Sequence, residues 1–95
     1  MVVGILTIRP ALPAETLKEK RSIVKSVIER LRQKYNAGVA EVEDLDDAGL
    51  TTIAAVCVSN AGSHADSQMQ AMARAVEESR LDVEVLSIET GLVRG

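Results

Sequence analysis

The chain has 95 residues, a net charge of -3 and 46% hydrophobic residues, a composition typical of a single globular domain. With no Phe, no Trp and a single Tyr, it has almost no aromatic side chains for stacking on a ligand. One cysteine excludes an internal disulfide and the thiolate clusters of iron–sulfur and zinc sites, and it favours a reducing compartment. Because residues 1–9 lack a basic leader and no apolar run approaches about 18 residues, we expect a cytoplasmic protein without a membrane segment.

The first third of the chain predicts a strand followed by a long helix. Residues 2–9 form an apolar run typical of a strand, and Pro10 is expected to end it because proline lacks a backbone donor. Thr16 and Glu19 have the spacing of a capping box, so a helix should begin there. Apolar residues recur at helical spacing through the following turns. Residues 36–38, Asn-Ala-Gly, supply the expected C-cap of this helix.

The rest of the chain predicts a strand, a turn, a strand, a helix and a strand, at residues 39–44, 46–49, 50–59, 63–80 and 83–90. Ser63 and Asp66 repeat the capping-box spacing at the start of the second helix. That helix carries apolar residues at helical spacing and is expected to end near Arg80.

The predicted order of elements is that of an α+β, ferredoxin-like βαββαβ domain spanning residues 1–95. Such a fold has a four-stranded antiparallel sheet with two helices on one face. The first and third strands should be central, and each carries apolar residues on both faces. Because the helices cover only one face, the other would expose an apolar patch on a monomer. We therefore expect a homo-oligomer, most simply a homodimer.

Basic residues are concentrated in the first helix, where residues 18–34 hold seven of the eleven Lys and Arg. Several stand in the first turns, where the helix dipole and the free backbone N–H groups favour anions over cations. On a helical wheel, four of them fall within about 40° to 100° of the first apolar residue and form one flank. The candidate anion-binding or RNA-binding residues are Lys18, Lys20, Arg21, Lys25 and Arg32.

Two interpretations of this basic flank stay open. It can hold phosphates by charge and by backbone donors, without reading a base sequence. Alternatively it is a solvated helix face, because Glu15, Glu19 and Glu29 are near enough to neutralise much of its charge.

The acidic residues favour a structural role over a metal site. They are Glu41, Glu43, Asp44, Asp46 and Asp47. The EF-hand pattern fails because, counted from Asp44, Ala48 and Ala55 stand at the fifth and twelfth positions. A charged edge strand that discourages aggregation explains the cluster better. We expect no metal and no cofactor.

Cys57 and His64 do not form a convincing catalytic pair. Cys57 lies inside an apolar strand and is expected to be a buried core residue, whereas His64 should lie on the surface. Ser59 and Asn60 either line a pocket at the sheet edge or cap a turn.

Three runs of the sequence are distinctive: Leu17–Ser26, Val39–Glu43 and Val58–Asn60. Together they resemble the small bacterial YlxP-like family of uncharacterised proteins, over nearly the whole chain. The most specific element is Leu-Lys-x-Lys-Arg, at Leu17, Lys18, Lys20 and Arg21. The resemblance implies a ferredoxin-like domain of unestablished activity, often encoded near translation-initiation and ribosome-maturation factors, and it supplies no catalytic residue. Residues 45–50 depart from the family, which commonly has an aromatic there.

Two functions therefore compete. The first is a non-enzymatic RNA- or ribosome-associated module that contacts phosphates through the basic helix, because no predicted strand carries an aromatic for base stacking. The second is a dimeric small-molecule-binding or regulatory module with a ligand site at the sheet or the dimer seam. An acylphosphatase would need a Gly-rich, Arg-bearing loop after the first strand, and residues 10–14 contain neither residue. We predict no catalytic residues.

Overall fold

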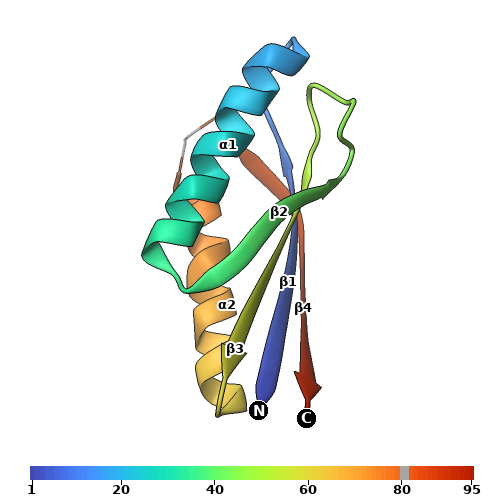
Figure 1. Ribbon diagram of the computed structural model, residues 1–95. Coiled ribbons are helices and arrows are strands. Elements are labelled where there is room, and N and C mark those ends of the chain that lie inside the picture. Colours follow the sequence, from blue (N-terminus) through green and yellow to red (C-terminus); the bar gives the residue numbers. More distant parts are fainter. Residues whose placement is uncertain (80–81) are drawn as a thin grey trace.

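The computed structural model describes residues 1–79 and 82–95 (Figure 1). Its elements are β1 (Val2–Ala11), α1 (Leu17–Lys34), β2 (Ala37–Glu43), β3 (Thr52–Ser59), α2 (Gly62–Glu77) and β4 (Glu84–Arg94). The strands pair antiparallel in the order β2-β3-β1-β4, and both helices lie on one face of the sheet. The predicted ferredoxin-like fold is confirmed.

The core lies between the helices and the sheet. β1 buries alternate residues, with Leu6 and Ile8 at 0% and 1% exposure, as the period of two in a strand requires. The other buried core residues on β3 and α2 include Ile53, Ala55, Cys57, Met69, Met72 and Val76. Burial of each large side chain among them stabilises the fold by about 1.5 to 3 kcal/mol. The expectation that Cys57 is a core cysteine is confirmed.

The start of α1 agrees with the sequence. Thr16 is the N-cap, and its Oγ1 accepts a hydrogen bond from the backbone N–H of Glu19 at 3.2 Å. The Thr16 hydroxyl in turn donates to the Glu19 carboxylate at 3.3 Å, so the second half of the capping box uses the hydroxyl in place of the backbone N–H. Local sequence therefore determines where α1 begins.

The end of α1 differs from the sequence prediction. The helix ends at Lys34, the backbone of Tyr35 is extended, and Gly38 already lies in β2. No glycine in the described residues has a positive φ, so the predicted glycine C-cap is wrong. Tyr35 packs partly against the core and its hydroxyl donates to the Ala71 carbonyl at 3.2 Å, which holds the chain in the extended turn toward β2.

The start of α2 is a second correction. The helix begins at Gly62 after Ala61, which makes no side-chain cap hydrogen bond. Ser63 therefore lies inside the first turn, and the predicted Ser63–Asp66 capping box is wrong. The cause is the preceding turn: Ser59 Oγ accepts from the backbone N–H of Ala61 at 3.2 Å and bends the chain before Ser63 is reached.

β1 runs past the proline that was expected to end it. Pro10 pairs with Val85 of β4 after a register shift at Arg9, and its carbonyl accepts from the backbone N–H of Thr51. A proline is tolerated there because a bulge relaxes the demand for a donor.

Other boundaries move by a few residues: β2 starts at Ala37, β3 at Thr52, α2 ends at Glu77 and β4 extends to Arg94. The predicted helix end near Arg80 lies outside the described residues.

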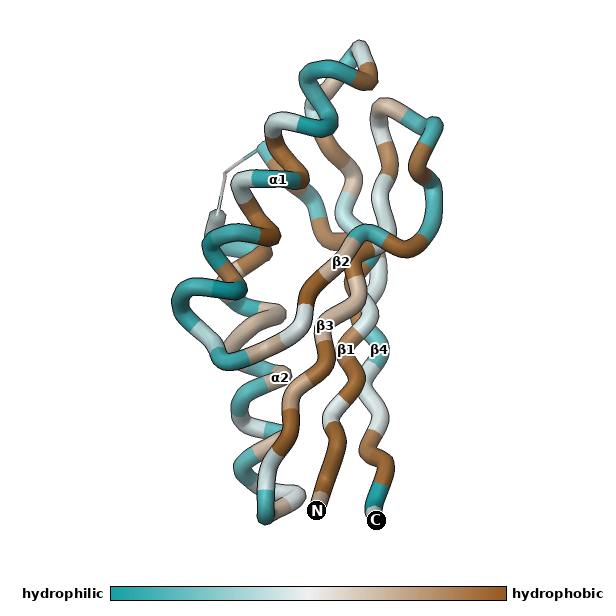
Figure 2. The backbone as a smooth tube through the Cα atoms, viewed as in Figure 1, coloured by the Kyte–Doolittle hydropathy of each residue, from teal (hydrophilic) through white to brown (hydrophobic). Residues whose placement is uncertain are grey.

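The open face of the sheet carries apolar side chains, as expected. Val3 pairs with Val58 and Val93, and Ile5 pairs with Val56, so these five share the face opposite the helices. Val58 is 63% exposed and Val93 is 54% exposed. Figure 2 shows the hydrophobic character of β1 and β3 along the end of the sheet where both termini lie. That a partner covers this face stays a prediction.

Gly4 allows close packing in the core. A Cβ at this position would lie 2.9 Å from Cys57 Sγ and 3.1 Å from Met69 Sδ. We expect Gly4→Ala to lower the free energy of unfolding by about 1 to 3 kcal/mol, because these neighbours must move apart. Urea unfolding measures the change. Gly38→Ala is the matched control, since nothing lies within 4 Å of its Cβ. Equal losses in the two variants would contradict the tight contact at Gly4.

Candidate anion-binding groove

A groove between α1 and β2 brings together three of the predicted basic residues. Arg21, Lys25 and Arg32 line it from α1, and Ala40 and Glu41 line it from β2. Its volume is about 410 Å³. The three cations share one face of the helix because their spacings of four and seven residues are close to whole turns.

The groove combines an apolar floor with a charged rim. Val24 is buried and Ile28 is half-buried, and both line the groove between the cations. Glu29 is the exposed acid of the rim. A floor of this kind excludes water from one side of a bound group, which strengthens its attraction to the rim charges.

Within the described residues, Arg21 and Lys25 of the groove form no direct ion pair. Among residues 1–79 and 82–95, the ion pairs within 4 Å are Arg9–Glu43 and Lys20–Glu41. Arg21 and Lys25 are both exposed, and neither is in that set. The interpretation that neighbouring acids of α1 neutralise this flank through contact therefore has no ion pair to support it in the part of the chain described.

Arg32 is held at one end of the groove. Its Nη2 donates a hydrogen bond to the backbone carbonyl of Val39, which also ties the last turns of α1 to β2. A guanidinium has five N–H donors, so others remain for a ligand.

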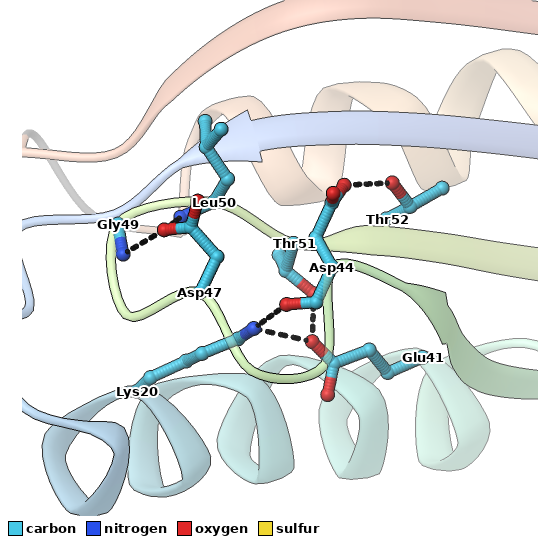
Figure 3. A network of polar contacts seen from close by, with 8 residues as sticks. All are labelled: Lys20, Glu41, Asp44, Asp47, Gly49, Leu50, Thr51 and Thr52. Carbon is cyan, nitrogen blue, oxygen red and sulfur yellow. Dashed lines mark hydrogen bonds and ion pairs between the residues drawn. The ribbon is translucent and has the colours of Figure 1, made fainter.

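Lys20 is a correction to the predicted anion-binding set. Only 1% of the residue is exposed, its Nζ lies 3.0 Å from Glu41 Oε2, and it also donates to the backbone carbonyl of Asp44 (Figure 3). It is therefore unavailable to an external anion. The signal was in the sequence: on the helical wheel Lys20 falls at about 300°, between Val27 at about 280° and Leu31 at about 320°, on the core side.

The burial of Lys20 nevertheless shapes the groove. Its ammonium neutralises Glu41, which would otherwise be an acid in the β2 wall. Among the groove-lining residues of the described chain, Glu29 then carries the one negative charge that is not paired with Lys20. It stands against the three positive charges of Arg21, Lys25 and Arg32. The local charge is positive although the whole chain is acidic.

The acidic hairpin between β2 and β3 is held by hydrogen bonds (Figure 3). Glu41 accepts from the Thr51 hydroxyl, and Asp44 Oδ2 accepts from the Thr52 hydroxyl at 2.8 Å. Asp47 Oδ1 accepts from the backbone N–H groups of Gly49 and Leu50, at 2.9 and 3.2 Å. Asp44 adopts a φ of 61°, a left-handed conformation that aspartate tolerates better than most residues. These contacts fix the loop that closes over Lys20.

Lys18 lies apart from the groove. It lines a separate pocket of about 430 Å³ with Pro13 and Ser22, and Asp82 also contributes to that pocket. The predicted flank is thus divided: three cations line the groove, Lys20 is buried, and Lys18 lies in another pocket.

Sequence reasoning missed one polar contact outside the groove. Ser59 Oγ lies 2.9 Å from His64 Nδ1, at the turn between β3 and α2. His64 is exposed, as expected, and Ser59 also accepts the Ala61 N–H, so the pair stabilises this turn. Cys57 Sγ instead lies 4.0 Å from the Ala65 carbonyl, and the Cys–His pairing considered from sequence does not form.

Comparisons with known proteins agree with this fold. A de novo designed protein with a ferredoxin fold, LFR1 1, studied in solution by NMR, is 20% identical with a TM-score of 0.57 and covers 100% of this chain and 88% of its own. The de novo designed protein Foldit4 is 13% identical with a TM-score of 0.54 and covers 98% of each chain. At these identities the likeness shows the fold alone.

No helix in the described residues is long and apolar enough to span a membrane. No curated protein matches the chain. A family model described as a protein of unknown function, DUF503, matches residues 3–90. The match covers most of the sequence, and the chain belongs to the DUF503 family.

Proposed function

We propose that this protein is a non-enzymatic binding module whose groove between α1 and β2 holds the phosphates of RNA. The observation that carries the proposal is the alignment of Arg21, Lys25 and Arg32 along one groove whose β2 carboxylate is already neutralised by Lys20. From Arg21 to Arg32 the helix rises about 16 Å, which is long enough for several phosphates of a single strand.

The recognition is electrostatic and does not read bases. Tyr35 is the one aromatic of the chain, and its ring packs against the core while its hydroxyl donates to the Ala71 carbonyl. No aromatic platform therefore accompanies the groove, and stacking of bases on aromatic rings contributes nothing to affinity. Contacts to phosphates position a protein on RNA without specifying sequence.

The finer family assignment belongs to the same proposal. The Leu-Lys-x-Lys-Arg start of α1 resembles that of the bacterial YlxP-like proteins, and ribosomal RNA in the cytoplasm is the partner class that this resemblance favours. Within that motif Lys20 has a structural role and Arg21 lines the groove, so the motif serves both stability and charge.

A salt titration tests the proposal. With three phosphate contacts, the affinity for fluorescein-labelled single-stranded RNA should fall with about the second power of salt concentration, because about 0.7 counterions are released per contact. Arg21→Ala and Lys25→Ala should each lower that exponent by about 0.7, and Lys34→Ala, at the end of α1 outside the groove, should leave it unchanged. Fluorescence anisotropy from about 50 mM salt upward measures it, and an absence of binding at about 50 mM would overturn the proposal.

A dimeric small-molecule-binding or regulatory module is the second candidate. The apolar open face of the sheet favours it, because Val56 and Val58 are 40% and 63% exposed and a second copy would cover them. Competition separates the two candidates. The first candidate holds if short RNA displaces the labelled RNA, whereas millimolar inorganic phosphate and small dicarboxylates do not. The reverse order of potency supports the second candidate.

A further inference from the structure

β4 is a long edge strand with less protection than the opposite edge of the sheet. It forms one border of the sheet and runs for 11 residues. It contains neither proline nor lysine, the residues that commonly guard an edge against pairing with another chain. Four of its apolar side chains are between 41% and 55% exposed: Leu86, Ile88, Leu92 and Val93.

The opposite edge is protected. β2 has 7 residues, a register irregularity between Glu41 and Glu43, and carboxylates at both positions. Glu43 pairs with Arg9 at 3.6 Å. Each edge strand has one register irregularity, which in β4 leaves Leu86 without a partner in β1. β2 is the shorter strand and carries carboxylates at its irregularity, so it is the less ready of the two edges to pair.

We propose that β4 pairs antiparallel with β4 of a second copy, across a two-fold axis at Thr90, and joins two four-stranded sheets into one. The charges of the strand favour this direction. Its first residue, Glu84, is acidic and its last, Arg94, is basic, so antiparallel pairing brings the acidic start of each strand near the basic end of the other. Parallel pairing would place like charges together.

Side-chain complementarity selects the register. With Thr90 on the axis, Ile88 lies opposite the partner subunit's Leu92, and by symmetry this apolar pair occurs twice. Both residues are 41% exposed and lie on the helix side of the sheet, since they pair with Ile8 and Gly4 of β1. Pairing would therefore cover the apolar surface that α2 leaves open at this edge.

The neighbouring registers are worse. An axis at Glu89 would place the two Glu89 carboxylates directly opposite each other, and like charges in that position destabilise a strand pair. An axis at Gly91 would place Ile88 opposite the partner's Arg94 and Leu92 opposite the partner's Thr90, so the apolar pair would be lost. The Thr90 axis places Leu86 opposite the partner's Arg94 but keeps the Ile88–Leu92 pair. With the axis at Thr90, Glu89 lies opposite the partner's Gly91, and the threonines face each other in a favourable pair.

This interface lies at the edge of the sheet remote from the groove. β2, which lines the groove, is at the other border, so pairing through β4 leaves both grooves of the dimer open. The inference goes beyond the proposed function and does not depend on it. The open face also stays uncovered, and the prediction that a partner covers it is tested by the same variants.

Analytical ultracentrifugation of the full chain at about 1 to 100 µM tests the proposal, since that range brackets the dissociation constants of weak to moderate dimers. We expect a wild-type dimer and, in Leu92→Lys, a dissociation constant raised by at least about tenfold, because two introduced ammonium groups meet the apolar pair. Val58→Lys, on the open face, should leave the dimer unchanged. A wild-type monomer across this range, or loss of the dimer in V58K but not in L92K, would overturn the pairing.

Two further variants test the register and guard against simple misfolding. Combining I88E with L92K should restore the dimer, because the introduced carboxylate of each chain then faces the introduced ammonium of the other. T90C should cross-link at the axis under mild oxidation, since directly opposed residues of an antiparallel pair lie within disulfide range. The native Cys57 is buried and cannot substitute for it. Failure of both the rescue and the cross-link in folded protein would overturn the Thr90 register.

Discussion

Lys20→Met should lower the free energy of unfolding by about 3 to 5 kcal/mol, the range observed when one partner of a buried ion pair is removed. Methionine keeps most of the buried stem, so little packing is lost. The ammonium disappears, and both the Glu41 carboxylate and the Asp44 carbonyl lose its contact. The side chain of Glu41 is 16% exposed, which places the expected loss toward the lower end of the range. Urea unfolding at neutral pH measures it.

Two control variants separate charge from packing. Lys18→Met removes the same charge two residues earlier at an exposed position, and its effect should stay within about 0.5 kcal/mol. Adding Glu41→Gln to Lys20→Met should recover much of the loss, because no buried carboxylate is left unpaired and the Thr51 hydroxyl keeps an oxygen to donate to. If K20M were as stable as K18M, the ion pair would contribute nothing and the structural role of Lys20 would be refuted.

The fold was predictable because it depends on patterns that repeat along the chain. Alternating burial in β1 and the helical spacing of apolar residues in α1 each point toward one core, and together they specify the order of elements. Thr16 shows the same for a local feature, since a cap needs only residues three positions apart. Ser63 shows the limit: its capping-box spacing is present, but the turn at Ser59 starts the helix earlier.

The groove was predictable only on its α1 side. The spacing of Arg21, Lys25 and Arg32 places them together on any helix, whatever the tertiary structure. The opposite wall comes from Glu41 of β2, and no local sequence pattern predicts that β2 lies against α1. The same contact between α1 and β2 explains why Lys20 is buried. A lysine at a buried position stabilises the fold only when a carboxylate from another element pairs with it. Here the position of that carboxylate, Glu41, depends on the β2–β3 hairpin.

Arg21→Glu combined with Lys25→Glu should reduce the affinity for single-stranded RNA by more than about tenfold at about 50 mM salt. Each substitution removes an attractive charge and adds a repulsive one in the groove, where Glu29 is already present. The salt exponent should fall from about 2 to about 0.7, because only the Arg32 contact still releases counterions at about 0.7 per phosphate. Both residues are exposed, so the variant should fold with nearly wild-type stability.

The matched control is Arg30→Glu combined with Lys34→Glu. It changes the net charge by the same amount on the same helix, but Arg30 and Lys34 lie outside the groove. If binding follows the groove, this control should keep most of its affinity and its salt exponent, with a small loss from the altered long-range field that salt screens. Equal losses in the two double variants would mean that RNA senses only the overall charge of the helix. In that case the cations of α1 act as a diffuse basic surface, and the alignment of Arg21, Lys25 and Arg32 along β2 has no part in binding.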